Sequence, residues 1–362
     1  MKEERELGSL IRSFATGGAY MGAHLFGGGH IHDTFRVDVD AAGARTHFML
    51  QRINTHVFPH VAELMENVAR VSAHIAACVA GEPDEERRAL KLVPDTGGNF
   101  LHRDGEGNCW RMFRFIQGAH APNKVERPEQ ALRMAQAFGR FQQQLITLPG
   151  PRLHETIPGF HDTPRRFAAL EQAIEADAAG RAAQAKAEIE FAMSRKAMAA
   201  RIVEAKLPER VAHYDAKPNN VLMDDATGEA LCVIDLDTAM PGLAVYDFGD
   251  MVRAATSPTD EDEQDLSRVK MQMDLFEALA RGYVSTAGAF LTKEEKAHLV
   301  LAGKVITFEN GVRFLADYLA GDTYYKVHRA GQNLDRCRTH FRLVESIEEQ
   351  EETMMRIMEL VG

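Results

Sequence analysis

The sequence predicts an α+β protein of two lobes: a small N-terminal lobe rich in β-strands and a larger, mostly helical C-terminal lobe. Apolar and polar residues alternate over 35–39, which is the period of a half-buried strand. Helical periodicity dominates after a polar segment at 117–123. We therefore place the lobe boundary at this segment and expect lobes of residues 1–116 and 117–362.

The N-terminal lobe is expected to hold a short antiparallel sheet and one helix. Residues 24–53 form extended segments that are separated by turn residues at 40–43. Pro59 then opens a segment with apolar residues at helical spacing, and proline is favourable there because its missing N–H loses no helical partner. Two more extended segments follow at 90–93 and 108–116.

The C-terminal lobe is expected to be helical except for a compact region of strands and loops between Val211 and Phe248. The segment 173–187 is rich in alanine, which has the highest helix propensity, so we predict a helix there in spite of Gly180. Its charged residues favour a solvated face over a ligand site.

Composition and charge restrict the classes of function. The chain has 362 residues, of which 45% are apolar and 26% charged, as in folded globular proteins. Its 42 Lys and Arg residues against 53 Asp and Glu residues give a formal charge of −11, and the chain has no basic stripe, which argues against nucleic acid as a partner. The four cysteines form no C-x-x-C pair, so neither a disulfide framework nor a zinc site is indicated. Without a signal-like N-terminus or a long apolar run, we expect a cytoplasmic protein with no membrane partner.

The chemistry is concentrated in one loop and the strand that follows it. His213 stands two residues before Asp215, Asn220 follows five residues after Asp215, and Asp235 ends a predicted buried strand. Phosphoryl transfer needs one group that orients the attacking hydroxyl and accepts its proton, and oxygen ligands that hold Mg²⁺ against the nucleotide phosphates. Asp215 can supply the first function, and Asn220 and Asp235 the second. A lone Asp in a loop more often makes a turn or caps a helix, but these residues together match the kinase catalytic loop in type and order.

A second motif, Asp247-Phe248-Gly249, has the letters of the D-F-G motif of protein kinases in a different place. It begins 32 residues after Asp215, whereas Asp235 lies 20 residues after it, on the expected strand. We therefore assign the metal to Asp235, and expect Asp247 and Asp250 to brace the catalytic loop or to cap a helix that starts near Phe248. No A-P-E sequence follows, which favours a small-molecule acceptor.

The N-terminal lobe should bind the nucleotide. Gly28, Gly29 and His30 lie in a glycine-rich turn between two predicted strands, where backbone N–H groups can approach phosphates closely. A plain β-turn is an equal alternative. The turn matches neither the dinucleotide fingerprint nor the Walker motif.

Two other features of this lobe are expected to contact the nucleotide. Arg52 on the third strand should neutralise the phosphates and pair with Glu66 on the next helix, with Glu63 as a second candidate partner; a surface arginine is the alternative. Phe113 and Phe115 belong to the aromatic segment that ends at the lobe boundary, where adenine would bind; otherwise these rings are simple core.

Several segments, together with Arg313 and Tyr324, follow one another in the order found in a known family: 29–31 with 33–34, 50–54, 65–67, 160–163, 213–222, 232–250, 313–319 and 321–324. Through them the sequence resembles the aminoglycoside phosphotransferase and choline kinase-like superfamily, and within it most of all the bacterial N-acetylhexosamine 1-kinases. The resemblance implies a protein-kinase-like fold and ATP- and Mg²⁺-dependent phosphorylation of the anomeric hydroxyl of GlcNAc or GalNAc. It implies that Asp215 activates the C1 hydroxyl, that Asn220 and Asp235 hold the metal, and that Arg313 and Tyr324 contact the sugar.

Two alternatives stay open at this point. The same fold could phosphorylate another hydroxyl compound, such as glucosamine, an aminoglycoside, choline or homoserine. A cationic acceptor would favour an acidic or aromatic pocket, and Arg313 argues against it. The chain could also be a degraded kinase that only binds nucleotide, but the presence of Asp215, Asn220 and Asp235 argues against that. We expect a monomer or a weak homodimer.

Overall fold

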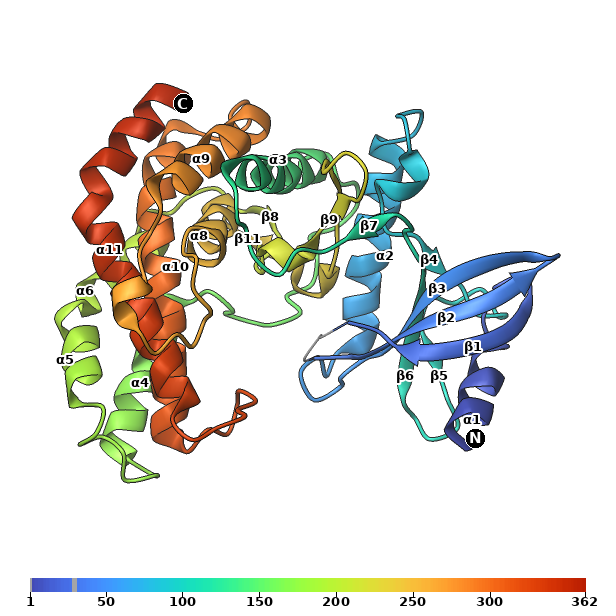
Figure 1. Ribbon diagram of the computed structural model, residues 1–362, viewed down its shortest axis with the longest axis horizontal. Coiled ribbons are helices and arrows are strands. Elements are labelled where there is room, and N and C mark those ends of the chain that lie inside the picture. The colour runs from blue at the N-terminus through green and yellow to red at the C-terminus, as the bar shows by residue number, and fades with distance from the viewer. Residues whose placement is uncertain (1, 28–30) are drawn as a thin grey trace.

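The computed structural model of the chain describes residues 2–27 and 31–362 (Figure 1). It has the two-lobed α+β architecture that the sequence predicts. The N-terminal part, blue to cyan in Figure 1, forms an antiparallel sheet with helices on both faces, and the remainder is mostly helical. Among these residues, no helix is both long enough and apolar enough to cross a membrane.

In the described part of the chain, six strands form the N-terminal sheet, in the order β1-β2-β3-β6-β4, with β5 also paired to β6. All of these pairings are antiparallel. The turn between β2 and β3 consists of Ala42 and Gly43, both with positive φ, which is the geometry of a tight hairpin. The strands are β1 (Ala19–Leu25), β2 (Asp33–Ala41), β3 (Ala44–Arg52), β4 (Leu92–Val93), β5 (His102–Arg103) and β6 (Cys109–Arg114).

The two faces of this sheet are covered by different helices. Leu50 packs on one face, in an apolar cluster with Ile11 of α1 (Lys2–Ile11). Met49 and Phe113 pack on the opposite face, against α2 (Val61–Cys78). Because side chains of a strand alternate between its faces, the parity of each residue decides whether it points toward α2 and the C-terminal lobe or away from them.

The chain leaves the sheet after Arg114 and passes to a second group of strands. We propose that the connection 115–118 separates the lobes, with the boundary between residues 116 and 117. The later strands pair as β10-β9-β7 and as β11-β8. They are β7 (Ala119–His120), β8 (Arg210–Ala212), β9 (Val221–Asp224), β10 (Ala230–Val233) and β11 (Met240–Gly242).

The C-terminal lobe is built on two long helices, α10 and α11, which lie side by side, with α8 and α4 packed against α10 (Figure 1). The α-helices are α3 (Pro128–Leu145), α4 (Thr163–Ala176), α5 (Lys186–Ser194), α6 (Lys196–Ala199), α7 (Arg201–Glu204), α8 (Ala244–Ala255), α9 (Met273–Ala287), α10 (Lys293–Ala320) and α11 (Gln332–Val361). Short 3₁₀ helices are η1 (Glu85–Arg87), η2 (Pro218–Asn220), η3 (Leu236–Thr238) and η4 (Leu266–Arg268).

The helix predicted over 173–187 is wrong as a single element. Helix α4 ends at Ala176 because Asp177 adopts the left-handed conformation, and its carboxylate accepts hydrogen bonds from the backbone N–H groups of Arg181 and Ala182. Gly180 also has a positive φ. Local side-chain to backbone hydrogen bonds therefore replace the helix that the alanine content favours.

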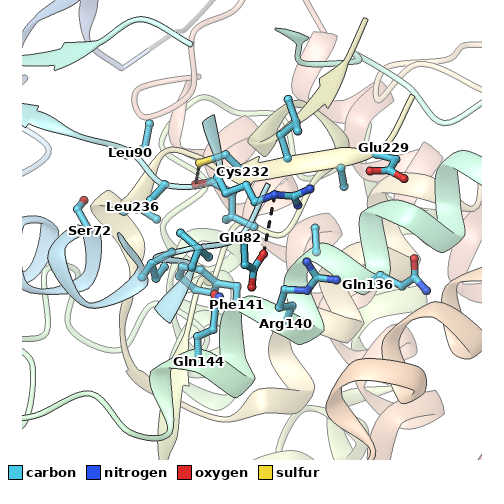
Figure 2. Close-up of a pocket in the computed structure, with 18 of the residues that line it drawn as sticks. Ser72, Glu82, Leu90, Gln136, Arg140, Phe141, Gln144, Glu229, Cys232 and Leu236 are labelled. Carbon is cyan, nitrogen blue, oxygen red and sulfur yellow. Dashed lines mark hydrogen bonds and ion pairs between the residues drawn. The ribbon is translucent and has the colours of Figure 1, made fainter. Parts of the chain in front are cut away.

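A cavity of about 290 Å³ lies between α2, α3 and β10 (Figure 2). Its walls combine apolar side chains with charged ones, among them Glu82 and Arg140. Asp215, Asn220 and Asp235 do not line it, so this cavity is separate from the catalytic loop.

Gly249, the last residue of the D-F-G letters, lies at a close contact between two helices. The motif lies inside α8, where a Cβ atom on Gly249 would stand 2.6 Å from the carbonyl oxygen of Ala302 on α10. A side chain at this position would force the two helices apart.

We expect Gly249→Ala to lower the free energy of unfolding by about 1–3 kcal/mol, because overpacked helix contacts cost that much. Gly105→Ala is the matched control, since a Cβ there meets open space, and its effect should stay within about 0.5 kcal/mol. Urea denaturation followed by circular dichroism measures both variants. Equal stability of the two variants would contradict the close packing of α8 on α10.

Candidate active site

The predicted catalytic loop runs from the end of β8 into η2, and its polar side chains converge. The Nδ2 atom of Asn220 donates to the carbonyl oxygen of Asp215 (2.8 Å) and to its Oδ2 atom (2.9 Å). The Nζ atom of Lys217 lies 2.7 Å from the same Oδ2. No donor within residues 2–27 and 31–362 bonds to Oδ1 of Asn220, so this oxygen is free to face a ligand.

His213 holds this loop against the core. Its side chain is buried between the rings of Phe138 and Phe141, with centroids at 5.4 and 5.7 Å. Nε2 donates to the carbonyl oxygen of Ile234 at 2.9 Å, and Nδ1 accepts from the backbone N–H of Asp215 at 3.3 Å. The histidine therefore connects the catalytic loop to the residue that precedes Asp235.

Asp247 braces the loop from behind, which confirms one of the two roles expected for it. Its buried carboxylate accepts hydrogen bonds from the backbone N–H groups of His213 (2.9 Å) and Tyr214 (2.8 Å) and from Nε2 of Gln142 (2.6 Å). Tyr214 has a φ of +67°, a conformation that costs a non-glycine residue about 1–3 kcal/mol unless its surroundings enforce it. The helix begins at Ala244, earlier than expected.

Asp250 follows one turn later in α8. It accepts from Nε of Arg253 at 2.6 Å, and both side chains are largely buried. Asp250 is therefore half of an ion pair within the helix, and the bracing of the loop rests on Asp247.

Asp235 lies at the end of β10, directly before η3, with a φ of +60°. The residue keeps some surface exposed to solvent, and its side chain has no hydrogen-bond or salt-bridge partner among the described residues. Desolvation by the surrounding protein and repulsion from the carboxylates of Asp237 and Asp215 raise the pKa of Asp235. An unpaired carboxylate among other carboxylates is a position that a cation would stabilise.

The charge of Asp215 is controlled by Lys217, a residue that the sequence analysis missed. Burial alone would raise the pKa of Asp215, but the ammonium of Lys217 outweighs it and lowers that pKa. In return, Asp215 raises the pKa of Lys217 against the effect of burial. The signal for Lys217 was its position two residues after Asp215, in the same loop.

The donor set fits a hard divalent cation such as Mg²⁺. Carboxylate and amide oxygens are the ligands that Mg²⁺ takes, and it commonly binds through one or two protein groups together with substrate phosphates and water. Asp235 and the Oδ1 atom of Asn220 are such groups. Within the described ranges, no three His, Cys, Asp or Glu side chains form a complete metal cage, so a bound ion would depend on the phosphates.

The ion pair expected between Arg52 and Glu66 is not formed. Arg52 is exposed, donates to the carboxylate of Asp33 and lies with its guanidinium carbon 5.9 Å from the centre of the Trp110 ring. Glu66 accepts from Nε2 of His154 at 3.1 Å. The alternation of side chains along β3 explains why the pair is absent. Arg52 points to the face of the sheet that carries Leu50 and α1, away from Glu66 on α2.

The cation on the face toward α2 is Arg111, which the sequence analysis also missed. Its buried guanidinium donates to both carboxylate oxygens of Asp237 and, through Nε, to Oε1 of Gln51 at 2.9 Å. Gln51 stands directly opposite Arg111 in the register of β3 and β6. No local motif marks this pair, because Asp237 lies 126 residues away from Arg111.

The predicted adenine residues have different surroundings. Phe113 is buried in the apolar cluster against α2, with the guanidinium carbon of Arg111 5.2 Å from its ring centre. Phe115 is half-buried and packs edge-on against Phe26 at a centroid distance of 5.4 Å. Phe26 directly precedes the glycine-rich turn.

The residues predicted for that turn, Gly28, Gly29 and His30, lie outside the described residues.

Arg313 lies on α10, beside the catalytic loop. Its guanidinium carbon is 5.1 Å from the ring centre of Phe160 and 5.7 Å from that of Tyr325. Phe160 in turn packs on the ring of Tyr214 at 5.9 Å. In the part of the chain that the structure describes, Arg313 has no hydrogen-bond acceptor or carboxylate partner, so its N–H groups are available to a ligand.

A buried cluster joins α10 to the catalytic loop. Glu309, one turn before Arg313, accepts from Nδ1 of His161 (2.7 Å) and Oγ1 of Thr163 (2.7 Å). The ring of His161 stacks on Tyr214 at 5.2 Å. These contacts connect the turn of α10 that precedes Arg313 to Tyr214, the residue directly before Asp215.

Tyr324 is presented to solvent by a turn that Asp317 holds. The Asp317 carboxylate accepts from the backbone N–H groups of Thr323, Tyr324 and Tyr325, at 2.9, 2.8 and 3.0 Å. The Tyr324 ring is 68% exposed and packs edge-on against Tyr325. Because Tyr325 also contacts Arg313, the structure brings both predicted sugar-binding residues to one region.

Known proteins share this fold. Residues 22–288 match the family described as the phosphotransferase enzyme family, APH. A solved aminoglycoside phosphotransferase from Alicyclobacillus acidocaldarius is 14% identical, with a TM-score of 0.63, and the match covers 97% of this chain and 95% of that one. A choline kinase from Cryptosporidium parvum is 12% identical, with a TM-score of 0.55 and 97% of each chain covered. A spectinomycin phosphotransferase in complex with ADP and spectinomycin is 13% identical, with a TM-score of 0.57, over 96% of this chain and 98% of that one.

At these identities the solved structures show the fold, and they confirm the predicted kinase-like architecture of two lobes. The family match extends over most of the chain and contains the whole catalytic loop. This chain belongs to the APH phosphotransferase enzyme family.

Proposed function

We propose that the protein is an ATP- and Mg²⁺-dependent kinase that phosphorylates the anomeric C1 hydroxyl of N-acetylhexosamines, such as GlcNAc and GalNAc, to the sugar 1-phosphate. One observation carries the proposal: Asp215, Asn220 and Asp235 converge, and Arg313 is connected to their loop through the rings of Phe160 and Tyr214. Among the described residues, the Arg313 guanidinium has no hydrogen-bond or salt-bridge partner. The first three supply what phosphoryl transfer requires, and Arg313 indicates the kind of acceptor.

Asp215 is assigned to orient the sugar hydroxyl and to take its proton as the oxygen attacks phosphorus. The low pKa of this carboxyl keeps it ionised and able to accept a hydrogen bond. A Mg²⁺ ion bound by Asp235 and Asn220 would supply the positive charge that the phosphates need. Lys217 takes the cationic role first expected of Arg52, because its ammonium lies beside Asp215, whereas Arg52 points to the other face of the sheet.

For the nucleotide, we propose that adenine binds beside Phe26 and Phe115, at the connection between the lobes. Phe113 packs behind this position, in the apolar cluster against α2. Contact of Gly28, Gly29 and His30 with the phosphates stays a prediction. The carboxylate of Glu66 accepts a hydrogen bond from His154 and forms a salt bridge with Arg70.

The charges around the acceptor position favour a neutral, oxygen-rich substrate. Arg166 donates to the carbonyl oxygen of Phe160, whose ring contacts Arg313, so two guanidinium groups lie at the same residue. Burial and the charge of Arg313 lower the pKa of Arg166. The carboxylate of Glu309 is occupied by His161 and Thr163. An acceptor with an ammonium group, such as choline or an aminoglycoside, would meet repulsion here, whereas sugar hydroxyls and an N-acetyl carbonyl can accept from Arg313.

The direct test is ADP release from ATP and Mg²⁺ with GlcNAc, GalNAc, glucosamine, choline or kanamycin as acceptor. We expect the two N-acetylated sugars to stimulate ADP release most. Asp215→Asn should lower turnover by about 10²–10⁴-fold, the usual contribution of a general base. Asp225→Asn, in the exposed turn between β9 and β10, should be neutral. A preference for choline or kanamycin would contradict the proposed acceptor, and full activity of Asp215→Asn would contradict the proposed base.

Asp235→Asn separates metal binding from stability. Removing repulsion from Asp237 and Asp215 should raise the melting temperature in EDTA by roughly 1–3 °C. The same variant should lose the stabilisation that Mg²⁺ with ADP gives the parent protein. Differential scanning fluorimetry measures both effects, with Asp225→Asn as the control. A lower melting temperature in EDTA, or undiminished stabilisation by Mg²⁺ with ADP, would show that Asp235 is structural.

Arg313→Met should raise the KM for the sugar by about 10- to 100-fold, because hydrogen bonds to a charged group contribute about 1.5–3 kcal/mol. The KM for ATP should stay within about twofold. Arg342→Met is the control, since Arg342 pairs with Glu345 and Glu349 on the surface of α11. Steady-state kinetics with both substrates varied gives the values, and an equal rise of both KM values would contradict a sugar-specific role.

A further inference from the structure

A cluster of buried polar side chains connects the N-terminal sheet to the segment that carries Asp235. Its centre is the carboxylate of Asp237, which is 2% exposed. Both terminal nitrogens of Arg111 donate to this carboxylate, NH2 to Oδ2 at 2.9 Å and NH1 to Oδ1. Arg111 is itself 2% exposed, so two opposite charges are held together away from water.

His32 completes the cluster. The backbone N–H of Asn54 donates to Nδ1 of His32 at 3.0 Å, which leaves the ring proton on Nε2. Nε2 then donates to Oδ2 of Asp237. The tautomer of His32 is thus set by its neighbours, and its ring connects the end of β3 to Asp237.

The partners of Asp237 come from separate parts of the N-terminal lobe. Arg111 lies on β6, and Gln51, which accepts from Nε of Arg111, lies on β3. His32 stands between the glycine-rich turn and β2. Asp237 belongs to η3, two residues after Asp235. The Asp237 carboxylate therefore connects β6 directly, β3 through Arg111, and the residue that precedes β2 to the segment that carries Asp235.

The same segment needs such support because its backbone is strained. Asp235 has a φ of +60°, and non-glycine residues keep this conformation only where the structure around them enforces it. Oγ1 of Thr156 also donates to the carbonyl oxygen of Asp237, at 2.7 Å. Both the side chain and the backbone of Asp237 are thus fixed, two residues after the strained residue.

A buried ion pair is a costly way to add stability. The loss of hydration offsets much of the attraction between the charges, and well-packed apolar side chains of similar size often stabilise a fold as well or better. Groups around metal ligands, in contrast, orient those ligands, and their loss typically costs 10–100-fold in metal affinity or activity. The geometry therefore favours positioning over stability as the role of this pair.

Resting on the proposed function, we infer that Arg111, Asp237 and His32 are positioning residues for phosphoryl transfer. They hold Asp235 in its metal-binding position and fix the N-terminal sheet relative to it. This connection between the lobes takes the place of the strand-to-helix ion pair that was expected between Arg52 and Glu66.

The test uses the double variant Arg111→Met/Asp237→Leu, which replaces the ion pair with apolar side chains. The first readout is the affinity of the full-length protein for Mn²⁺ in the presence of saturating ADP, measured by water proton relaxation without any acceptor. The second is the affinity for ADP in EDTA, and the third is the melting temperature. Lys304→Met/Glu351→Gln, a partly buried ion pair between α10 and α11, is the matched control.

We expect the double variant to keep its fold and its affinity for ADP within about threefold, and to bind Mn²⁺ about 10–100-fold more weakly. The control should bind Mn²⁺ like the parent protein. Unchanged Mn²⁺ affinity in a folded double variant would overturn the inference. Absence of Mn²⁺ binding by the parent protein with ADP would instead overturn the proposed function, so the two failures are distinguishable.

A second pair of variants keeps the test decisive if the double variant does not fold. His32→Ala removes a donor to Asp237, whereas His32→Gln retains an N–H that can reach it. We expect His32→Ala to weaken Mn²⁺ binding at least fivefold and His32→Gln to restore most of it. Equal Mn²⁺ affinities of His32→Ala and the parent protein would overturn the inference.

Discussion

The candidate active site depends on one buried carboxylate, that of Asp247. It accepts the backbone N–H groups of His213 and Tyr214, and these bonds hold Tyr214 in a conformation that the residue would not adopt alone. Asp215 follows directly in the chain, so these hydrogen bonds also determine where Asp215 lies. Because Asp247 has no cationic partner in these bonds and burial raises its pKa, its role is to bind backbone donors rather than to balance charge.

The carboxylates of Asp247 and Asp237 thus position those of Asp215 and Asp235. Asp247 holds the backbone before Asp215 from the core of the C-terminal lobe, and Asp237 holds the backbone after Asp235 from the N-terminal sheet. The residues assigned to chemistry are the ones without rigid partners: Asp235 has none among the described residues, and Asp215 bonds within its own loop. Rigid support around open functional groups is what positioned phosphoryl transfer requires.

The sequence was sufficient for the fold class and for the residues that meet in the candidate site, because both depend on local patterns. Alternation predicted the antiparallel sheet, and the spacing of Asp215, Asn220 and Asp235 identified residues that the fold does bring together. The prediction of an Arg52–Glu66 pair was wrong because a shift of one residue along a strand moves a side chain to the other face of the sheet. The Arg111–Asp237 pair joins residues far apart in sequence, which no local pattern can predict. The prediction of one helix over 173–187 was wrong because the Asp177 carboxylate binds backbone N–H groups that a continuous helix would use.

The position of the new phosphate on the product tests the account most directly. The reaction of the protein with ATP, Mg²⁺ and GlcNAc should be followed by phosphorus and proton nuclear magnetic resonance. If Asp215 activates the anomeric hydroxyl, the phosphorus signal will couple to the proton on C1. Coupling to the protons on C6, or a phosphorylated product from an amine-bearing alcohol alone, would contradict the proposed placement of the sugar between Asp215 and Arg313.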